Sequence, residues 1–167
     1  VMMAWRIAYC KIFYPLAYYA AFFSIRASAF SYEIMCQGRD KLEYYLADYK
    51  KRADTLSKKE QDTLRDMRIV QEMYARGYDF MPIDIYRAQA DRFQIIDGKL
   101  MPSLSSIAGL GLSAAEGVVY AAMDGPFLSK EDFRNRSKVS KTICDLMSDM
   151  GILGDLPESN QLSLFDF

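Results

Sequence analysis

Two glycines followed by a helix start form the pattern in this sequence with the clearest chemical use. Gly109 and Gly111 flank Leu110, and Ser113 and Ala114 follow at the expected beginning of a helix. Because glycine has no Cβ, its backbone can approach a phosphate closely, and helix N-terminal amides attract negative charge. Such a hairpin would contact the DNA backbone rather than base edges. A tight turn between packed helices explains the same glycines without any ligand.

In a second, similar unit, a basic cluster lies at the equivalent turn, which has no glycines. Arg136, Lys138 and Lys141 offer cations there for phosphate contacts, although a solvated surface explains them equally well. The apolar spacing indicates that a helical unit is duplicated, because one set of helical positions recurs in the same order. The two sets are Ala115, Val118, Val119 and Ala122, then Ile143, Leu146, Met147 and Met150.

The last residues are different in kind. Gln161, Leu162, Ser163, Leu164 and Phe165 place large apolar side chains and one amide beyond the last expected helix. An extended peptide that fills apolar pockets on a partner and is fixed by an amide hydrogen bond explains this pattern. A tail that folds back onto its own domain is the alternative.

The composition limits the remaining chemistry. The 167 residues are 51% hydrophobic and 26% charged, as in ordinary globular proteins, and the net charge of −1 requires any DNA contact to be local. With no histidine and three scattered cysteines, we expect no metal site, no disulfide and no independent catalytic centre. Glu131 and Asp132, the nearest carboxylate pair, are typical of a helix start.

The apolar N-terminal region predicts neither a membrane span nor a signal peptide. The uncharged stretch 12–25 is divided by Pro15 and is shorter than the roughly 20 residues that a span needs. Residues 1–5 read as the interior of a helix without a capping residue. We therefore expect the chain to be part of a longer protein.

Capping signals and glycines predict the helix boundaries of the first half. A helix is expected to begin at Pro15, whose fixed φ suits a first helical turn. A helical region over 31–50 is expected to break at Gly38. Residues 57–60 form a capping box, and Gly77 ends the helix that they open.

The second half mixes extended and helical signals. Asp97-Gly98 between apolar runs predicts a β-hairpin. Ser113 and Glu116 read as a capping box, and Ser129 as the start of another helix. The predicted fold class is mainly α with a short β-hairpin (α+β).

The whole chain resembles the C-terminal portion of the PolC-type alpha subunit of DNA polymerase III, the bacterial replicative polymerase. The resemblance implies four segments. They are a helical distal fingers segment (1–77), a strand and hairpin connector (78–104), a tandem helix-hairpin-helix module that binds duplex DNA (105–156), and a clamp-binding tail (157–167). The matching segments are Trp5–Tyr9, Tyr14–Ala20, Ile25–Ala27, Tyr78–Phe80, Ile83–Arg87, Gly109–Gly111, Phe127–Asp132, Lys138–Thr142 and Asn160–Phe165.

The same resemblance implies a role in chromosome replication in the cytoplasm. Its implied partners are primer-template DNA, a sliding clamp bound by 161–165, and the remainder of the polymerase. The magnesium-binding catalytic aspartates of the family lie in a palm that this chain lacks, so we expect no cofactor and no activity from it alone. Arg6 and Lys11 are candidates for nucleotide or template contacts, with a structural role favoured. A helical protein-interaction scaffold without DNA contact is the alternative function.

Overall fold

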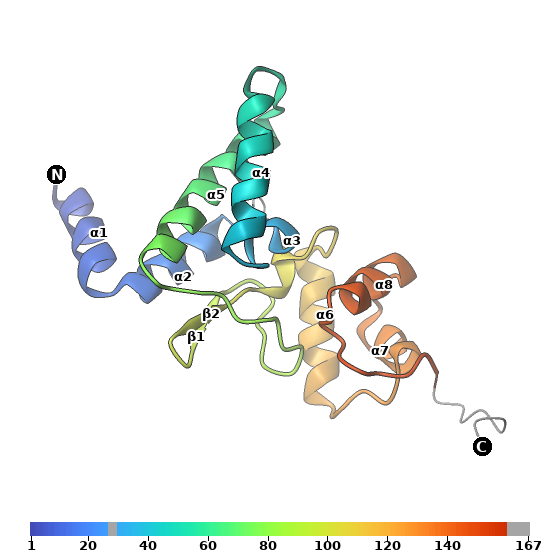
Figure 1. Ribbon diagram of the computed structural model, residues 1–167. Coiled ribbons are helices and arrows are strands. Elements are labelled where there is room, and N and C mark those ends of the chain that lie inside the picture. Colours follow the sequence, from blue (N-terminus) through green and yellow to red (C-terminus); the bar gives the residue numbers. More distant parts are fainter. Residues whose placement is uncertain (27–29, 160–167) are drawn as a thin grey trace.

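The computed structural model describes residues 1–26 and 30–159. Over these residues the chain forms eight α-helices, two short 3-10 helices and one antiparallel β-hairpin, so the predicted fold class is confirmed (Figure 1). The predicted clamp-binding residues 161–165 lie outside the described residues. The elements are α1 (Met2–Phe13), α2 (Pro15–Ile25), α3 (Tyr32–Met35), α4 (Arg39–Lys51), η1 (Ala53–Thr55), α5 (Lys58–Ala75), β1 (Gln94–Ile96), β2 (Lys99–Met101), η2 (Leu104–Ser106), α6 (Leu112–Met123), α7 (Lys130–Ser137) and α8 (Lys141–Asp149).

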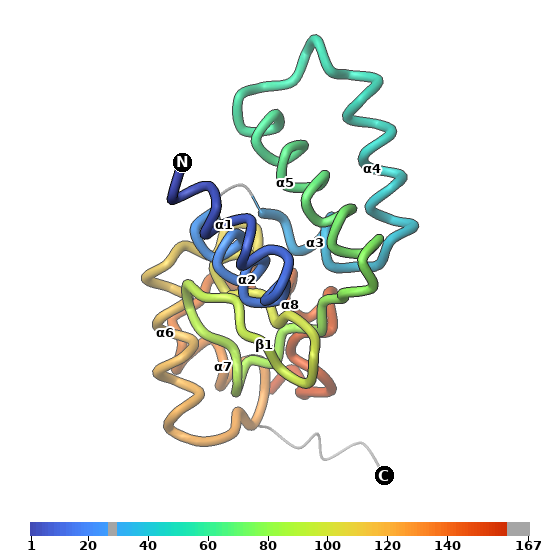
Figure 2. The backbone as a smooth tube through the Cα atoms, turned by 90° about the vertical axis from the view of Figure 1, so that its left-hand side faces the viewer, coloured from blue at the N-terminus to red at the C-terminus, as the bar shows by residue number. Residues whose placement is uncertain are grey.

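Helices α4 and α5 pack together as an arm that rises above the rest of the molecule (Figures 1 and 2). The predicted capping box opens α5, because Ser57 accepts a hydrogen bond from the Glu60 amide and the Glu60 carboxylate accepts one from the Ser57 amide at 2.8 Å. Gly38, with φ of +93°, separates α3 from α4 as expected. The side chains of Leu42 and Leu46 are buried on the inner face of α4.

Polar contacts hold the end of α1, although no residue of α1 is buried. The Lys11 ammonium lies 2.8 Å from the Glu72 carboxylate, which also accepts a hydrogen bond from the Tyr19 hydroxyl at 2.7 Å. Arg76 donates to the Lys11 carbonyl at 3.0 Å and so satisfies one of the last carbonyls of the helix. The side chain of Lys11 therefore has a structural role here.

The β-hairpin separates two hydrophobic cores. Its turn residues Asp97 and Gly98 both have positive φ, at 50° and 75°, as the predicted two-residue hairpin turn requires. Successive side chains of β2 point to opposite faces. Leu100 is buried in the core formed with α2, α4 and α5, whereas Met101 is buried in the core formed with α6, α7 and α8. The connector thus joins the helical arm to the C-terminal module.

Two expectations about the C-terminal module are wrong in detail. Helix α6 begins two residues earlier than predicted, with Gly111 instead of Ser113 at the N-cap and no side-chain cap bond, so Ser113 and Glu116 form no capping box. The repeat is also shifted by one position from the predicted register. The structure matches Ala115 with Cys144, both fully buried, and not with the half-buried Ile143.

Among the described residues, no helix is both long enough and apolar enough to span a membrane.

Candidate nucleic-acid interface

The first hairpin connects η2 to α6 through a turn whose core-facing residue is Leu110. The Leu110 side chain is buried, and its amide donates to the Ile107 carbonyl at 3.1 Å. Gly109 precedes it with φ of +80°, and a Cβ at that position would lie 2.8 Å from Cδ1 of Ile143 in α8. The buried Leu110 side chain therefore anchors the turn to the core, and the missing Cβ of Gly109 allows Ile143 of α8 to pack against the turn.

Gly111 and the first turn of α6 face outward. Gly111 is exposed, and a Cβ at this position would meet no atom within 4 Å. The first intrahelical bond runs from the Ala115 amide to the Gly111 carbonyl. The amides of Leu112, Ser113 and Ala114 precede that bond, and no side chain caps them in the described structure. These three donors and the helix dipole form an anion-attracting surface.

The second hairpin repeats the backbone of the first with different side chains. Lys138 has φ of +60°, Val139 is buried, and Ser140 is the N-cap of α8 with φ of −65° and ψ of 156°. The corresponding Gly111 has φ of −66° and ψ of 161°. The Ser140 hydroxyl accepts a hydrogen bond from the Ile143 amide, so this helix start is already capped.

A surface groove joins the two hairpins. It is lined on one side by Gly111, Ser113 and Ala114 and on the other by Ser137 and Lys138. Within the described part of the chain, the Lys138 ammonium has no ion-pair partner. The structure thus brings most of the predicted phosphate-binding residues onto one surface. Lys141 is exposed at the start of α8 but does not line this groove.

Arg136, predicted as a phosphate contact, has its guanidinium group occupied within the fold. It donates to the carbonyls of Ala121, Gly125 at 3.0 Å and Pro126 at 3.1 Å, which lie at and just beyond the end of α6. The guanidinium also lies 4.5 Å from the centre of the Phe127 ring. This side chain holds the α6–α7 connection in place.

Gly117 is a residue whose role the motif analysis missed. A Cβ at Gly117 would lie 2.9 Å from the Ser137 carbonyl oxygen, so α6 contacts the end of α7 backbone to backbone. A glycine inside a helical pattern is a known signal of such close packing. The two hairpins owe their spacing to this contact and to the contact of Gly109 with Ile143.

The chain that leads toward residue 160 is fixed to the start of α7. The amides of Lys130 and Glu131 donate to the carbonyls of Pro157 and Glu158 at 2.8 and 3.1 Å. The Lys130 ammonium lies 2.5 Å from the Glu158 carboxylate, and this hydrogen bond raises the pKa of Lys130. Pro157 and Glu158, the first residues of the predicted tail segment, are therefore bound to the start of α7.

Of the two acidic residues predicted to mark the start of α7, Glu131 and Asp132, the second makes contacts typical of a helix start. The Asp132 amide donates to Ser129, and its carboxylate accepts from the Leu128 amide at 3.0 Å. Over the described ranges, no group of three or more His, Cys, Asp or Glu residues lies close enough together to hold a metal ion.

Comparison with known proteins identifies the relatives of the chain. The family profile of the helix-hairpin-helix motif matches residues 77–162. "DNA polymerase III PolC-type" proteins match 99% of this chain, with 41% identity in Caldanaerobacter subterraneus subsp. tengcongensis, 46% in Streptococcus mutans serotype c and 44% in Listeria monocytogenes serovar 1/2a. The chain spans 11% to 12% of the length of these curated relatives.

Proposed function

This chain belongs to the helix-hairpin-helix family and is homologous to PolC-type DNA polymerase III, and we propose on that basis that it grips duplex DNA for a replicative polymerase. The first hairpin and Lys138 contact the phosphate backbone of the primer-template duplex without reading its sequence. The observation that supports this most directly is the exposed start of α6, where uncapped amides at residues 112–114 follow the open Gly111. Lys138 adds positive charge across the groove.

Gly111→Asn tests the DNA contact without relying on a damaged fold. Asparagine is a favoured N-cap residue, and its side-chain oxygen would accept hydrogen bonds from the amides that we assign to phosphate. We expect helix stability to be retained while duplex affinity falls roughly ten- to a hundredfold, the value of one or two hydrogen bonds to a charged group. The readout is fluorescence anisotropy with a labelled duplex oligonucleotide.

Gly98→Asn is the matched control, because it makes the same change in the exposed turn of the β-hairpin. Asparagine tolerates positive φ, so this variant should fold and bind DNA as the unmodified chain does. Unchanged affinity in a folded Gly111→Asn variant would instead support the protein-interaction scaffold.

The tail 161–165 is proposed to bind a sliding clamp. Its sequence combines Gln161 with the apolar side chains of Leu162, Leu164 and Phe165, a composition suited to pockets on a partner. The contacts of Pro157 and Glu158 support this proposal, since they hold the segment just before the tail beside α7. Clamp and duplex would then be bound by neighbouring segments of one chain.

Removal of residues 161–167 tests clamp attachment. We expect a sliding clamp to co-purify with the full chain and not with the shortened one, while duplex binding stays unchanged. Anisotropy titrations at two salt concentrations separate the two activities, because phosphate contacts release counterions and apolar contacts do not. Equal salt dependence for the two partners would contradict this division.

Helix α1 is proposed to pack against other parts of the polymerase. Its apolar side chains are exposed along its length, with Trp5 at 74% and Ile12 at 65%, and the relatives are about eight times longer than this chain. Nucleotide transfer with its magnesium ions is assigned to those other parts. The isolated chain should therefore incorporate no nucleotide in a primer-extension assay, and measurable incorporation would overturn this assignment.

A further inference from the structure

A cleft lies between the helical arm and the first hairpin. One wall comes from α3, α4 and the start of α5 and includes Tyr49 and Lys59. The other wall is the hairpin itself, from Ala108 through Gly109 to Leu112. The cleft therefore opens directly beside the α6 amides to which phosphate binding is assigned.

Two charged residues at the arm side of this cleft, Arg52 and Glu60, are engaged in contacts within the arm. Arg52 lies 2.7 Å from Asp48 and 3.7 Å from Glu60, so its charge is balanced on both sides. Glu60 also accepts hydrogen bonds from the hydroxyl and amide of Ser57, and these bonds lower the pKa of its carboxyl group. The Glu60 carboxylate on the cleft wall is thus already engaged by Ser57 and Arg52.

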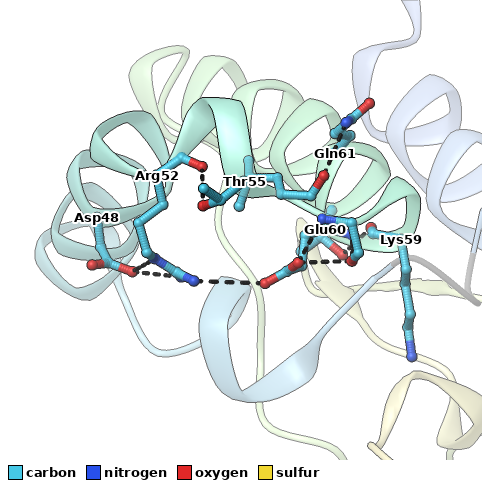
Figure 3. Close-up of polar contacts among 9 residues, drawn as sticks. Asp48, Arg52, Thr55, Lys59, Glu60 and Gln61 are labelled. Atoms are coloured by element: carbon cyan, nitrogen blue, oxygen red, sulfur yellow. Dashed lines mark hydrogen bonds and ion pairs between the residues drawn. The ribbon is translucent and has the colours of Figure 1, made fainter.

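Lys59 differs from these residues. Its side chain points away from the Asp48–Arg52–Glu60 chain of contacts (Figure 3), and its ammonium has no ion-pair partner among residues 1–26 and 30–159. Neighbouring Lys58 is also exposed but does not line the cleft. Only one of two adjacent lysines at the start of α5 therefore faces the hairpin across the cleft.

We propose that Lys59 is a further phosphate contact, and that the DNA-binding surface extends from the helix-hairpin-helix module onto the arm. A nucleic-acid strand whose phosphate lies on the α6 amides continues through the cleft, where the Lys59 ammonium meets another phosphate of the same backbone. Lysine suits this task because it is a point charge on a long, flexible stem. The inference rests on the proposed DNA binding and adds α5 to the residues that perform it.

The tight local structure at the start of α5 supports a fixed position for this lysine. The capping box of Ser57 and Glu60 sets the first turn of the helix, and the Arg52 contact ties that turn to α4. The Lys59 carbonyl accepts a hydrogen bond from the Thr63 hydroxyl at 3.1 Å. The backbone of Lys59 is therefore held in place while its side chain stays available to a ligand.

The test compares Lys59→Gln with Lys58→Gln in the full chain, using a labelled duplex oligonucleotide over a range of salt concentrations. Both variants lose one positive charge from the same helical turn, but only the first loses it from the cleft. We expect Lys59→Gln to lower duplex affinity about two- to fivefold, as for an exposed charge contact. The slope of log affinity against log salt should fall by about 0.9, the value for one phosphate contact. Lys59→Arg, which keeps the charge, should restore both.

The outcomes separate this inference from the proposed function. If Lys59→Gln and Lys58→Gln bind equally well while Gly111→Asn binds weakly, the hairpin contacts DNA and the extension onto the arm is wrong. If the unmodified chain does not bind the duplex, the proposed function fails first. A loss of affinity in Lys59→Gln that Lys59→Arg does not restore would also overturn the inference, because it would point to altered folding rather than lost charge.

Discussion

Lys138 adopts the left-handed backbone conformation that Gly109 adopts at the matching position of the first hairpin, with φ of 60° against 80°. A side chain in this region is strained, and the strain exceeds the extra entropy that glycine loses on folding. We therefore expect Lys138→Gly to raise the free energy of unfolding by about 0.5–1 kcal/mol. Urea denaturation followed by far-UV circular dichroism measures this change.

Lys138→Ala serves as the control, because it removes the same charge and keeps the strain. A stability gain of similar size in the alanine variant would show that the charge of Lys138, and not its backbone conformation, reduces the free energy of unfolding. Lys138→Gly should also weaken duplex binding, since the ammonium beside the groove is lost. Stability and affinity are thus expected to change in opposite directions.

Gly117→Ala is expected to destabilise the module although alanine favours helices. The added Cβ would lie 2.9 Å from the backbone oxygen of Ser137, which cannot move without shifting α7. Overpacking of this kind typically costs about 1–3 kcal/mol, more than the gain in helix propensity of roughly 1 kcal/mol. Thermal unfolding of Gly117→Ala beside Glu116→Ala, an exposed neighbour on α6, is the measurement. A variant as stable as the control would contradict the close contact.

The local signals in the sequence predict most helix starts and stops. Ser57 and Glu60 cap α5, Pro15 begins α2, and the Asp97-Gly98 turn forms the hairpin, because each depends on neighbouring residues alone. The same reasoning failed at Ser113, where serine and glutamate match a capping box but the backbone places Gly111 at the N-cap.

Longer-range contacts explain what the sequence alone did not predict. Arg136 looks like a surface cation until the fold brings the carbonyls at the end of α6 around it. Lys59 lies in a different predicted segment from Gly109, and only the packing of the arm places both beside one cleft. The register of the repeat depends on which residues are buried, and the apolar spacing matched Ala115 to Ile143, the neighbour of its true counterpart.

Arg136→Lys is expected to destabilise the α6–α7 connection by about 1–3 kcal/mol. A lysine cannot reproduce the planar group that donates to the carbonyls of Gly125 and Pro126 while it lies over the Phe127 ring. Chemical denaturation should show this loss, whereas Arg134→Lys, an exposed position on the same helix, should be neutral. Equal stability of the two variants would indicate that the contacts of Arg136 contribute little.

The contacts that attach the end of α1 to α5 through Glu72 are expected to weaken in acid. Burial raises the pKa of Glu72, but hydrogen bonds from Lys11 and Tyr19 outweigh it and leave the pKa below its ordinary value of 4.5. A carboxyl group whose pKa is lower in the folded state stabilises the fold above that ordinary value, and this contribution is lost as the pH falls through the folded pKa. The Lys11–Glu72 contact should therefore persist at pH 4.5 and break only at lower pH, as the pH falls through the folded-state pKa of Glu72.

Trp5, the single tryptophan of the chain, reports this change because it lies on α1. Its fluorescence anisotropy should fall in acid before the far-UV circular dichroism signal is lost. Glu72→Gln should show the lower anisotropy already at neutral pH. If anisotropy and circular dichroism change together at every pH, the contact does not control α1 separately from the rest of the fold.

The exposed surface of α1 predicts self-association of the isolated chain. Trp5 and Ile12 belong to a continuous helix with no buried residue, and apolar surfaces of this kind form contacts with other molecules. Replacing both by glutamine should leave the fold intact and reduce concentration-dependent association in sedimentation velocity experiments. Tyr44→Gln, at an exposed position on α4, should not reduce it. If the double variant associates as strongly as the unmodified chain, then α1 does not form the contact between molecules. The proposed packing of α1 against the longer polymerase then loses its support.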